Sequence, residues 1–350
     1  IQSYAQCNGR YQSEIFNDVN IITVNYSDIY QDNEHEMDIY TPVGDTVTNR
    51  PVIIYLHGGT YTAGDKTLPD CVDFCKSFAK RGYVTASINY RLTTLSNFLS
   101  SNDEQIKAVL RSVADSKAAV RFFRKDASNG NSYGIDPSAI FVGGYSAGAV
   151  TAIHQAFIDD ISDLPANIQA LTSVIGGTIE GDAGNFGYPS NIQGVISIAG
   201  GIMDTNWIDS FDEPIVSAHG TNDGTISYNC DHATGWPIVL ILCGSGKIHP
   251  RANNVGVQND VLIFNGEDHS FPQNGNSNAK FVQSLDFFGD FLYPLLPCNT
   301  VTTITEDDNK EKKIIKIIDV LGRELESPKK NIPVFYIYED GAVKKHVFTE

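Results

Sequence analysis

The sequence predicts an α/β fold with a mostly parallel sheet covered by helices on both faces, followed by a small C-terminal β-unit. Short apolar segments alternate with longer segments of helical periodicity, which is the pattern of parallel β-α-β units. The segment 51–56 (PVIIYL) is apolar throughout, as expected of a strand buried on both faces. After Cys298 polar and apolar residues alternate between turn signals, which is typical of a small antiparallel unit.

The predicted elements follow one another in a regular order. Strands are expected at 19–26, 35–40, 51–56, 83–89, 139–142, 195–199, 214–218 and 261–264. Helices are expected at 70–80, 103–125, 147–158 and 280–292, the second of them with apolar residues at helical spacing. Residues 159–190 interrupt this alternation, and we expect them to form a small cap over the functional site, whose residues are identified below.

The chain has 350 residues, of which 41% are hydrophobic, and this is enough for a large core. We expect one large domain at 1–298, a linker at 299–309 and the β-unit at 310–350. Residues 301–350 hold 9 Lys and Arg against 10 Asp and Glu, which leaves 16 basic and 32 acidic residues in 1–300. Nearly all of the net charge of -17 therefore belongs to the large domain.

The acidic composition limits the partners that we expect. Nucleic acid is not among them, because phosphate binding needs clustered Lys and Arg. No run of about 18 apolar residues occurs, so no membrane span is expected. The chain starts at Ile1, and no basic segment leads into an apolar one, so we expect any signal peptide to have been removed. These features predict an acidic secreted protein.

The cysteines predict disulfides formed in an oxidising compartment. Metal binding is the alternative, because Cys71 and Cys75 lie one helical turn apart and His232 follows Cys230 closely. No C-x-x-C pair occurs, however, and no paired spacing matches a zinc site, so we expect neither a metal site nor a cofactor. A bond between Cys230 and Cys243 would close a short loop and is the first pairing that we expect.

The motif Gly144-Tyr145-Ser146-Ala147-Gly148 is the strongest signal for chemistry. It directly follows the predicted strand AIFVG and directly precedes a segment compatible with a helix. A nucleophile elbow requires this setting, in which a sharp turn exposes the serine and leaves room only for small neighbours. Serine is a weak nucleophile without an adjacent base, so Ser146 predicts a histidine partner. The alternative is a glycine-rich turn with an incidental serine.

The motif His57-Gly58-Gly59-Thr60 follows the strand at 51–56. Glycines let the backbone turn amide N–H groups toward a reacting carbonyl. We expect Gly59 and Thr60, together with the N–H of Ala147, to stabilise an oxyanion. His57 is expected to brace this loop rather than to act as the base.

The acid and the base should follow the serine in the order Ser, Asp or Glu, His. Asp223 lies in HGTND just after the strand at 214–218, and His269 lies in GEDHS just after the strand at 261–264. Catalytic groups gather where parallel strands end. Asp204 is the rival acid, and Asp268 is interpreted as a loop residue. Polar surface or satisfied core roles are expected for His35, His154, His232, His249 and His346.

The segments LHGGTYTAGD, RGYVTASINYRL, GGYSAGA, HGTND and GEDH together resemble the carboxylesterase/lipase branch of the α/β-hydrolases over residues 20–295. This resemblance implies a serine esterase with Ser146, Asp223 and His269 as its triad. It also implies substrate contacts from Tyr61 and Tyr145. The sequence departs from the lipase pattern at Thr60, where a third glycine is common. The segment GTIEGDAGNFGYPSNIQGVISIAGG is similar to one in bacterial esterases of decorated plant polysaccharides, among them feruloyl and acetyl xylan esterases.

The tail VLGRELESPKKNIPVFYIYEDGAVKKHVF resembles a type IX secretion sorting domain. That resemblance implies a bacterial protein at the cell surface or outside the cell, with the secretion machinery as a partner. The alternative is a small carbohydrate-binding or structural β-module.

Four functions remain open at this point. The leading one is a secreted esterase for acyl or hydroxycinnamoyl esters on a polysaccharide. The others are a polyester or cutin-type hydrolase, a peptidase, because a triad also cleaves amides, and a non-catalytic binding protein that keeps the fold.

Overall fold

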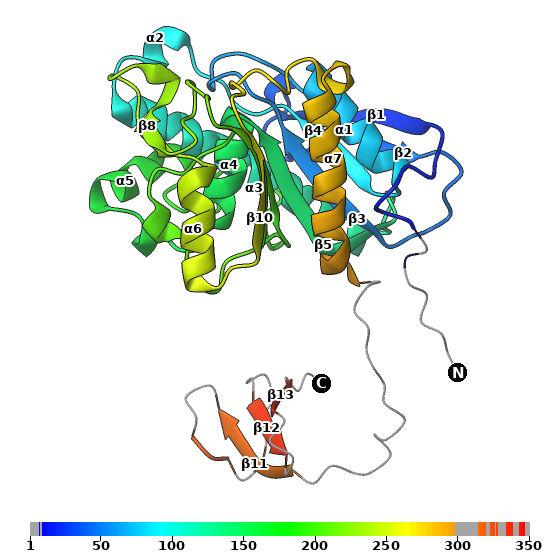
Figure 1. Ribbon diagram of the computed structural model, residues 1–350. Coiled ribbons are helices and arrows are strands. Elements are labelled where there is room, and N and C mark those ends of the chain that lie inside the picture. The colour runs from blue at the N-terminus through cyan, green and yellow to red at the C-terminus, as the bar shows by residue number, and fades with distance from the viewer. Residues whose placement is uncertain are drawn as a thin grey trace. The chain divides into compact units, whose positions relative to one another are not determined.

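The computed structural model describes residues 7, 9–297, 314–319, 323–325, 327, 334–338 and 343–346. The chain divides into two compact units, 1–300 and 301–350 (Figure 1). The predicted linker at 299–309 lies outside the described residues. None of the helices in the described part of the chain is long and apolar enough to cross a membrane.

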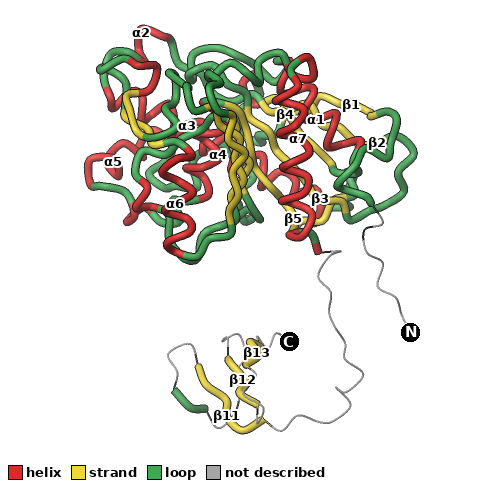
Figure 2. Tube along the Cα trace, in the orientation of Figure 1, coloured by secondary structure: helices red, strands yellow, loops and turns green. Residues whose placement is uncertain are grey.

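The first unit is built on one large sheet, whose strands are drawn in yellow between the helices in Figure 2. It has eight strands in the spatial order β1-β2-β4-β3-β5-β6-β7-β10. β1 pairs antiparallel with β2, and β2 antiparallel with β4, whereas the other neighbours are parallel. The strands are β1 Val19–Asn25, β2 Glu36–Pro42, β3 Arg50–Leu56, β4 Val84–Ile88, β5 Ile135–Tyr145, β6 Val195–Ile198, β7 Ile215–Gly220 and β10 Asn259–Phe264. The α/β architecture with a mostly parallel sheet is therefore confirmed.

Helices cover both faces of this sheet (Figure 1). Those of the first unit are α1 Pro69–Lys80, α2 Leu95–Phe98, α3 Asn102–Ser128, α4 Ala147–Ala156, α5 Ala166–Leu171, α6 Ser245–Val255 and α7 Ala279–Leu292. The side chains of β3 point alternately to the two faces, as the period of a strand requires. Ile54 packs with α3 and α4, whereas Ile53 and Tyr55 pack with α1 and α7.

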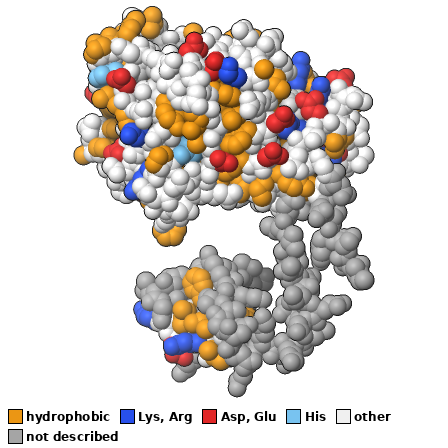
Figure 3. Space-filling model, in the orientation of Figure 1, with side chains coloured by type: hydrophobic (Ala, Val, Ile, Leu, Met, Phe, Trp, Pro, Cys, Tyr) orange, Lys and Arg blue, Asp and Glu red, His pale blue; other side chains and the backbone are white. Residues whose placement is uncertain are grey.

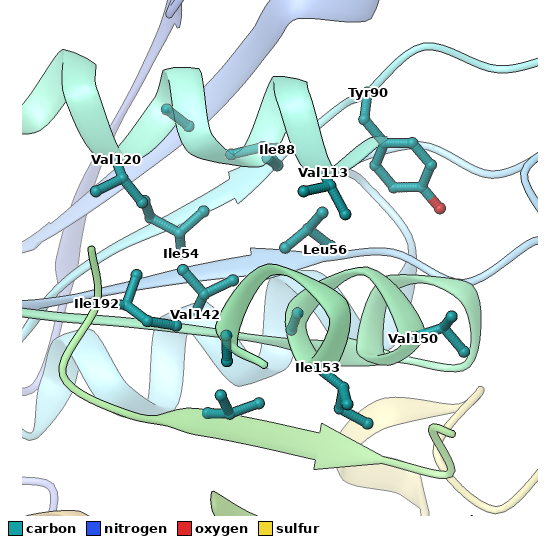
Figure 4. Packing of buried hydrophobic residues seen from close by; sticks show 14 of the residues in the cluster. Ile54, Leu56, Ile88, Tyr90, Val113, Val120, Val142, Val150, Ile153 and Ile192 are labelled. Carbon is teal, nitrogen blue, oxygen red and sulfur yellow. The ribbon is translucent and has the colours of Figure 1, made fainter. Parts of the chain in front are cut away.

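The face that carries α3 and α4 holds the largest apolar cluster (Figure 4). Val113 and Val120 of α3 approach Leu56 and Ile54 of β3, and Val150 of α4 belongs to the same cluster. All five side chains are buried. Burying one such side chain fully contributes about 1.5–3 kcal/mol, so this layer fixes the ends of the strands that carry the site.

Several elements of the first unit were not predicted from the sequence, among them the short helices α2 and α5. A short antiparallel pair, β8 Cys230–His232 and β9 Ile241–Cys243, forms a small sheet of its own. Cys230 is disulfide-bonded to Cys243, so the first pairing expected from the sequence is confirmed. Another unpredicted element is α6, which contains Pro250 and is followed by Gly256 in the left-handed conformation.

The second unit contains an antiparallel sheet in the order β11-β12-β13. Its strands are β11 Ile314–Asp319, β12 Val334–Tyr338 and β13 Val343–His346. A small antiparallel β-unit is what the alternating pattern of the tail predicts.

Candidate active site

Ser146 lies in the turn between β5 and α4. Its backbone has φ 54° and ψ -120°, a left-handed conformation that non-glycine residues rarely adopt. Its N–H donates to the carbonyl of Ile198 on the neighbouring strand β6, at 2.9 Å. Such local strain persists only where the surroundings hold it, and it is concentrated at functional sites.

The two glycines of the motif are required by close packing against β3. A Cβ atom on Gly144 would lie 2.6 Å from the carbonyl oxygen of Leu56, and one on Gly148 would lie 2.1 Å from the same atom. Both distances are shorter than any real contact. The sequence G-x-S-x-G is therefore fixed by the approach of α4 to the end of β3.

Ser146, His269 and Asp223 form a hydrogen-bonded row. The hydroxyl of Ser146 lies 2.8 Å from Nε2 of His269, and Nδ1 of His269 lies 2.7 Å from Oδ2 of Asp223. Because a carboxylate only accepts, Nδ1 carries the hydrogen and Nε2 is free to accept from the serine. The structure thus brings together the three residues that the sequence singles out.

The carboxylate of Asp223 is fully buried and heavily hydrogen-bonded. Its Oδ1 accepts the N–H groups of Thr225 and Ile226, both at 2.8 Å. Burial alone would raise the pKa of Asp223, but hydrogen bonds and charge interactions with His219 and His269 hold this pKa well below its usual range. The side chain is therefore an anion beside His269 at neutral and mildly acidic pH.

His219 is a neighbour of Asp223 that the sequence interpretation did not single out. It is the penultimate residue of β7, its side chain is fully buried, and its Nε2 lies 3.3 Å from Oδ2 of Asp223. The same nitrogen lies 2.9 Å from the carbonyl oxygen of Ile226, so it carries a hydrogen, while Nδ1 lies 2.9 Å from the hydroxyl of Ser245. The available signal was its position four residues before Asp223 and directly after the predicted strand 214–218.

The loop after β3 presents backbone amides beside Ser146. Gly59, Thr60 and Tyr61 have consecutive positive φ values of 124°, 55° and 61°. A Cβ atom on Gly59 would lie 1.9 Å from the carbonyl oxygen of Ala63, so only glycine fits there. Within the described residues, the N–H groups of Gly59, Thr60 and Ala147 have no hydrogen-bond acceptor in the protein. They are available to a bound oxyanion.

His57 is buried behind this loop. Its Nδ1 donates to the carbonyl of Gly58 at 2.6 Å, and its ring stacks on Tyr90 at a centroid distance of 4.2 Å. Burial lowers the pKa of His57, which keeps the ring neutral. These contacts hold the loop in position, as expected for a bracing residue.

Tyr61 and Tyr145 are both largely buried. The hydroxyl of Tyr61 donates to the carbonyl of Ala147 at 2.9 Å, while its ring lines the pocket beside Ser146. The hydroxyl of Tyr145 donates to the carbonyl of His269 at 2.9 Å, and the two rings are 5.1 Å apart. Tyr145 thus orients the loop that carries His269.

An apolar pocket opens at Ser146. It encloses about 510 Å³, including solvent at its mouth. The residues that line it are Thr60, Tyr61, Phe98, Gln105, Val109, Ser146, Ala147, Val150, Met203, Thr225, Ile226, Ala233, Thr234, Val239, Leu240 and Leu242. Apolar walls with a few polar groups among them are typical of a site that binds an organic ligand.

One wall of the pocket is the loop closed by the disulfide between Cys230 and Cys243. The side chain of Gln105 on α3 clamps this loop, since it donates to the carbonyl of Ile238 and accepts the N–H of Leu240, both at 2.9 Å. A covalent and a polar tie therefore hold the wall against α3.

The rival residues lie in other settings. Asp204 caps the short 3-10 helix Thr205–Trp207, and its Oδ1 accepts the N–H of Asn206 at 2.8 Å. Asp268 is exposed and caps its own turn through Ser270.

The other described histidines of the first unit are occupied elsewhere. Each of them hydrogen-bonds to a nearby carboxylate, amide or carbonyl oxygen, and they are His35, His154, His232 and His249. Within the described residues, no group of three or more His, Cys, Asp or Glu side chains is arranged to hold a metal ion.

Known esterases are similar to part of this chain. A protein-family model described as BD-FAE matches residues 37–177, which include the Ser146 turn and the Gly59 loop but neither Asp223 nor His269. Gut esterase 1 of Caenorhabditis elegans is 33% identical over 101 residues, which cover 29% of this chain. Phenmedipham hydrolase of Pseudarthrobacter oxydans is 33% identical over 122 residues, or 34% of this chain. The matches span only 17% and 22% of those two proteins.

Solved structures extend the likeness to most of the first unit. Thermogutta terrifontis esterase 2, phosphorylated by paraoxon, superposes with a TM-score of 0.56 at 20% identity, covering 78% of this chain and 93% of its own. A truncated carbohydrate esterase from gut microbiota gives a TM-score of 0.54 at 19% identity, covering 79% of this chain and 97% of its own. The chain therefore has the α/β-hydrolase fold, as the sequence predicts.

Proposed function

We propose that this protein is a serine carboxylic ester hydrolase that works through an acyl-enzyme. The observation that carries the proposal is the hydrogen-bonded row of Ser146, His269 and Asp223 at the mouth of an apolar pocket. The relatives named as esterases and a hydrolase support it.

In the acylation step, the Ser146 oxygen attacks the ester carbonyl while Nε2 of His269 takes the serine proton. Asp223 stays ionised and stabilises the imidazolium that forms. The N–H groups of Gly59, Thr60 and Ala147 stabilise the negative charge that develops on the carbonyl oxygen. His269 then gives its proton to the departing alkoxide, and the alcohol leaves.

Deacylation repeats these steps with water as the nucleophile. His269 takes a proton from the water, which attacks the acyl-serine, and then returns the proton to Ser146. The acid product leaves and the free enzyme is restored. No metal or cofactor takes part in this scheme.

The substrate that we propose is an acyl or hydroxycinnamoyl ester on a polysaccharide, outside a bacterial cell. The BD-FAE match and the likeness to a carbohydrate esterase support this class. The apolar pocket suits an acyl or aromatic group, and the disulfide suits an oxidising compartment.

A polyester or cutin-type substrate is the second candidate, because apolar side chains are exposed around the pocket. Leu95 of α2 is 56% exposed, and Trp236 and Ile238 of the disulfide-closed loop are 53% and 54% exposed. Figure 3 shows hydrophobic side chains on the surface over α2. Such side chains would favour adsorption to an apolar solid.

One substrate panel tests these proposals. p-Nitrophenyl butyrate, methyl ferulate, acetylated xylan and an amorphous polyester film are each incubated with the protein and with Ser146→Ala as the matched control. Turnover of methyl ferulate or acetylated xylan well above turnover of the film supports the polysaccharide ester. The reverse ranking supports the polyester. If no ester is turned over faster by the protein than by Ser146→Ala, the esterase proposal is wrong.

We further propose that the second unit directs export through the type IX machinery and takes no part in catalysis. Its own three-stranded sheet and its nearly balanced charge support a separate role. A chain ending at Thr300 should hydrolyse p-nitrophenyl butyrate at close to the full-length kcat/KM but stay inside the native host. Loss of activity only on an insoluble polymer would identify a binding module instead.

A further inference from the structure

A second apolar cavity lies directly behind the first. It is formed between α3 and the segment that includes α5, and it encloses about 470 Å³, including solvent at its mouth. The two cavities share Val109 and Met203 as wall residues. The other residues that line the second cavity are Ile106, Leu110, Val113, Lys117, His154, Ile158, Leu164, Ile168, Ile175, Ile179 and Trp207.

The polar groups at this cavity are already satisfied. Nδ1 of His154 donates to the carbonyl of Val150 at 2.7 Å, and its Nε2 accepts the N–H of Met203 at 3.3 Å. Burial lowers the pKa of His154 to about 4, so the ring is neutral. Lys117 is paired with Glu180 at 3.1 Å. The walls therefore have few free hydrogen-bonding groups for a polar ligand, and their apolar side chains favour a hydrocarbon.

Met203 lies between the two cavities, and its side chain is the one there that can change its conformation. Methionine has an unbranched chain with three rotatable bonds and adapts to irregular gaps. Its side chain is half-buried and packs against the apolar clusters on both sides, so it lies where the two cavities meet. Beyond it, the cavity follows α3 from Val109 to Lys117, eight residues that span about 12 Å at the rise of an α-helix.

We propose that the second cavity binds the distal part of a long acyl chain whose carbonyl lies at Ser146. This inference rests on the proposed esterase function and names a further class of substrate for the same site, esters of medium- and long-chain fatty acids. Each methylene group that enters such a cavity favours binding about fourfold. The selectivity should therefore rise with chain length until the cavity is filled.

A chain-length series tests the proposal. p-Nitrophenyl acetate, butyrate, octanoate and dodecanoate are compared for the wild type, for Ile168→Phe, which narrows the second cavity, and for Ala170→Phe. Ala170 is exposed on the same short helix and does not line the cavity, so it is the matched control. We expect Ile168→Phe to lower kcat/KM for dodecanoate about tenfold relative to acetate, and Ala170→Phe to leave this ratio unchanged. Equal losses on all four esters in Ile168→Phe would overturn the assignment.

A binding measurement keeps the test independent of catalysis, and its first part does not need the Ile168→Phe variant. The chain has two tryptophans, Trp207 in the cavity and the exposed Trp236. In the variant Ser146→Ala/Trp236→Phe, Trp207 is the only indole, and a bromine-labelled dodecanoic acid should quench its fluorescence saturably. The same label should bind at least several-fold more weakly when Ile168→Phe is added. No quenching, or equal affinity in both proteins, would contradict the proposal even if esterase activity is established. Quenching without any esterase activity would refute the proposed function alone.

Discussion

Nε2 of His269 lies 2.8 Å from Oγ of Ser146, although the two residues are 123 positions apart in the sequence. The order of the strands produces this approach. Ser146 follows β5, His269 follows β10, and Asp223 follows β7, which pairs with β10. The carboxyl ends of parallel strands meet at one edge of a sheet, where catalytic groups gather.

The role of Asp223 can be separated from that of Asp204. Asp223→Asn should lower kcat on p-nitrophenyl butyrate by a factor on the order of 10⁴, because the amide can neither fix the tautomer of His269 nor stabilise its imidazolium. Asp204→Asn is the control and should leave kcat near the wild-type value, since Asp204 only caps a turn. The reverse ranking would assign the acid to Asp204.

Activity should fall as the solution becomes acidic. The pKa of Asp223 is held well below its usual range, so this residue keeps its charge at neutral and mildly acidic pH. The loss must then come from the base, because a protonated imidazole cannot accept the serine proton. A profile of kcat/KM against pH should show one acidic limb. A flat profile between about pH 4 and 9 would exclude a histidine base.

The sheet and the catalytic row were predictable, because they depend on patterns local to each strand. Ser146, Asp223 and His269 each lie within a short motif just after an apolar run. The loop closed by Cys230 and Cys243 was not predicted as structure, because its strands are three residues long and are held by the disulfide and by Gln105 rather than by propensity.

Two further features depend on tertiary packing. α6 begins with Ser245 and Gly246 and contains Pro250, residues that lower helix propensity, so its sequence reads as a loop. The segment 159–190 was expected to cap the site. Its described residues pack against α3 and line the second cavity, and none of them lines the pocket at Ser146. Neither the helical structure of α6 nor the packing of the segment 159–190 can be predicted from local sequence.

The disulfide should stabilise the pocket wall. Cys230→Ser/Cys243→Ser removes a bond that spans 13 residues, and closure of a loop of about this size is worth roughly 3 kcal/mol. We expect a lower Tm and a higher KM for p-nitrophenyl butyrate, because the loop supplies one side of the pocket. Calorimetry and steady-state kinetics at a temperature where both proteins are folded measure these effects. Unchanged Tm and KM would show that Gln105 alone holds the wall.

Asp70 should make stability depend on pH in the opposite sense to Asp223. It is 2% exposed at the start of α1, and burial raises its pKa from 3.8 to about 7. Between those values the folded protein holds a proton that the unfolded chain releases, so stability falls as the pH rises toward 7. Asp70→Asn has no charge to bury, so its Tm should exceed that of the wild type at pH 8. The difference should shrink at pH 5. An equal difference at both pH values would exclude ionisation of Asp70 as the cause.

The most direct test of the catalytic assignment is the rate of Ser146→Ala on p-nitrophenyl butyrate, with circular dichroism to verify that the fold persists. Loss of the nucleophile should lower kcat by a factor on the order of 10⁴ to 10⁶, because no other group can form the acyl-enzyme. The residual rate should come from the oxyanion loop and substrate binding alone. A folded Ser146→Ala protein that keeps more than about a tenth of the wild-type kcat, against the loss expected for a triad nucleophile, would contradict the assignment of Ser146 as the nucleophile.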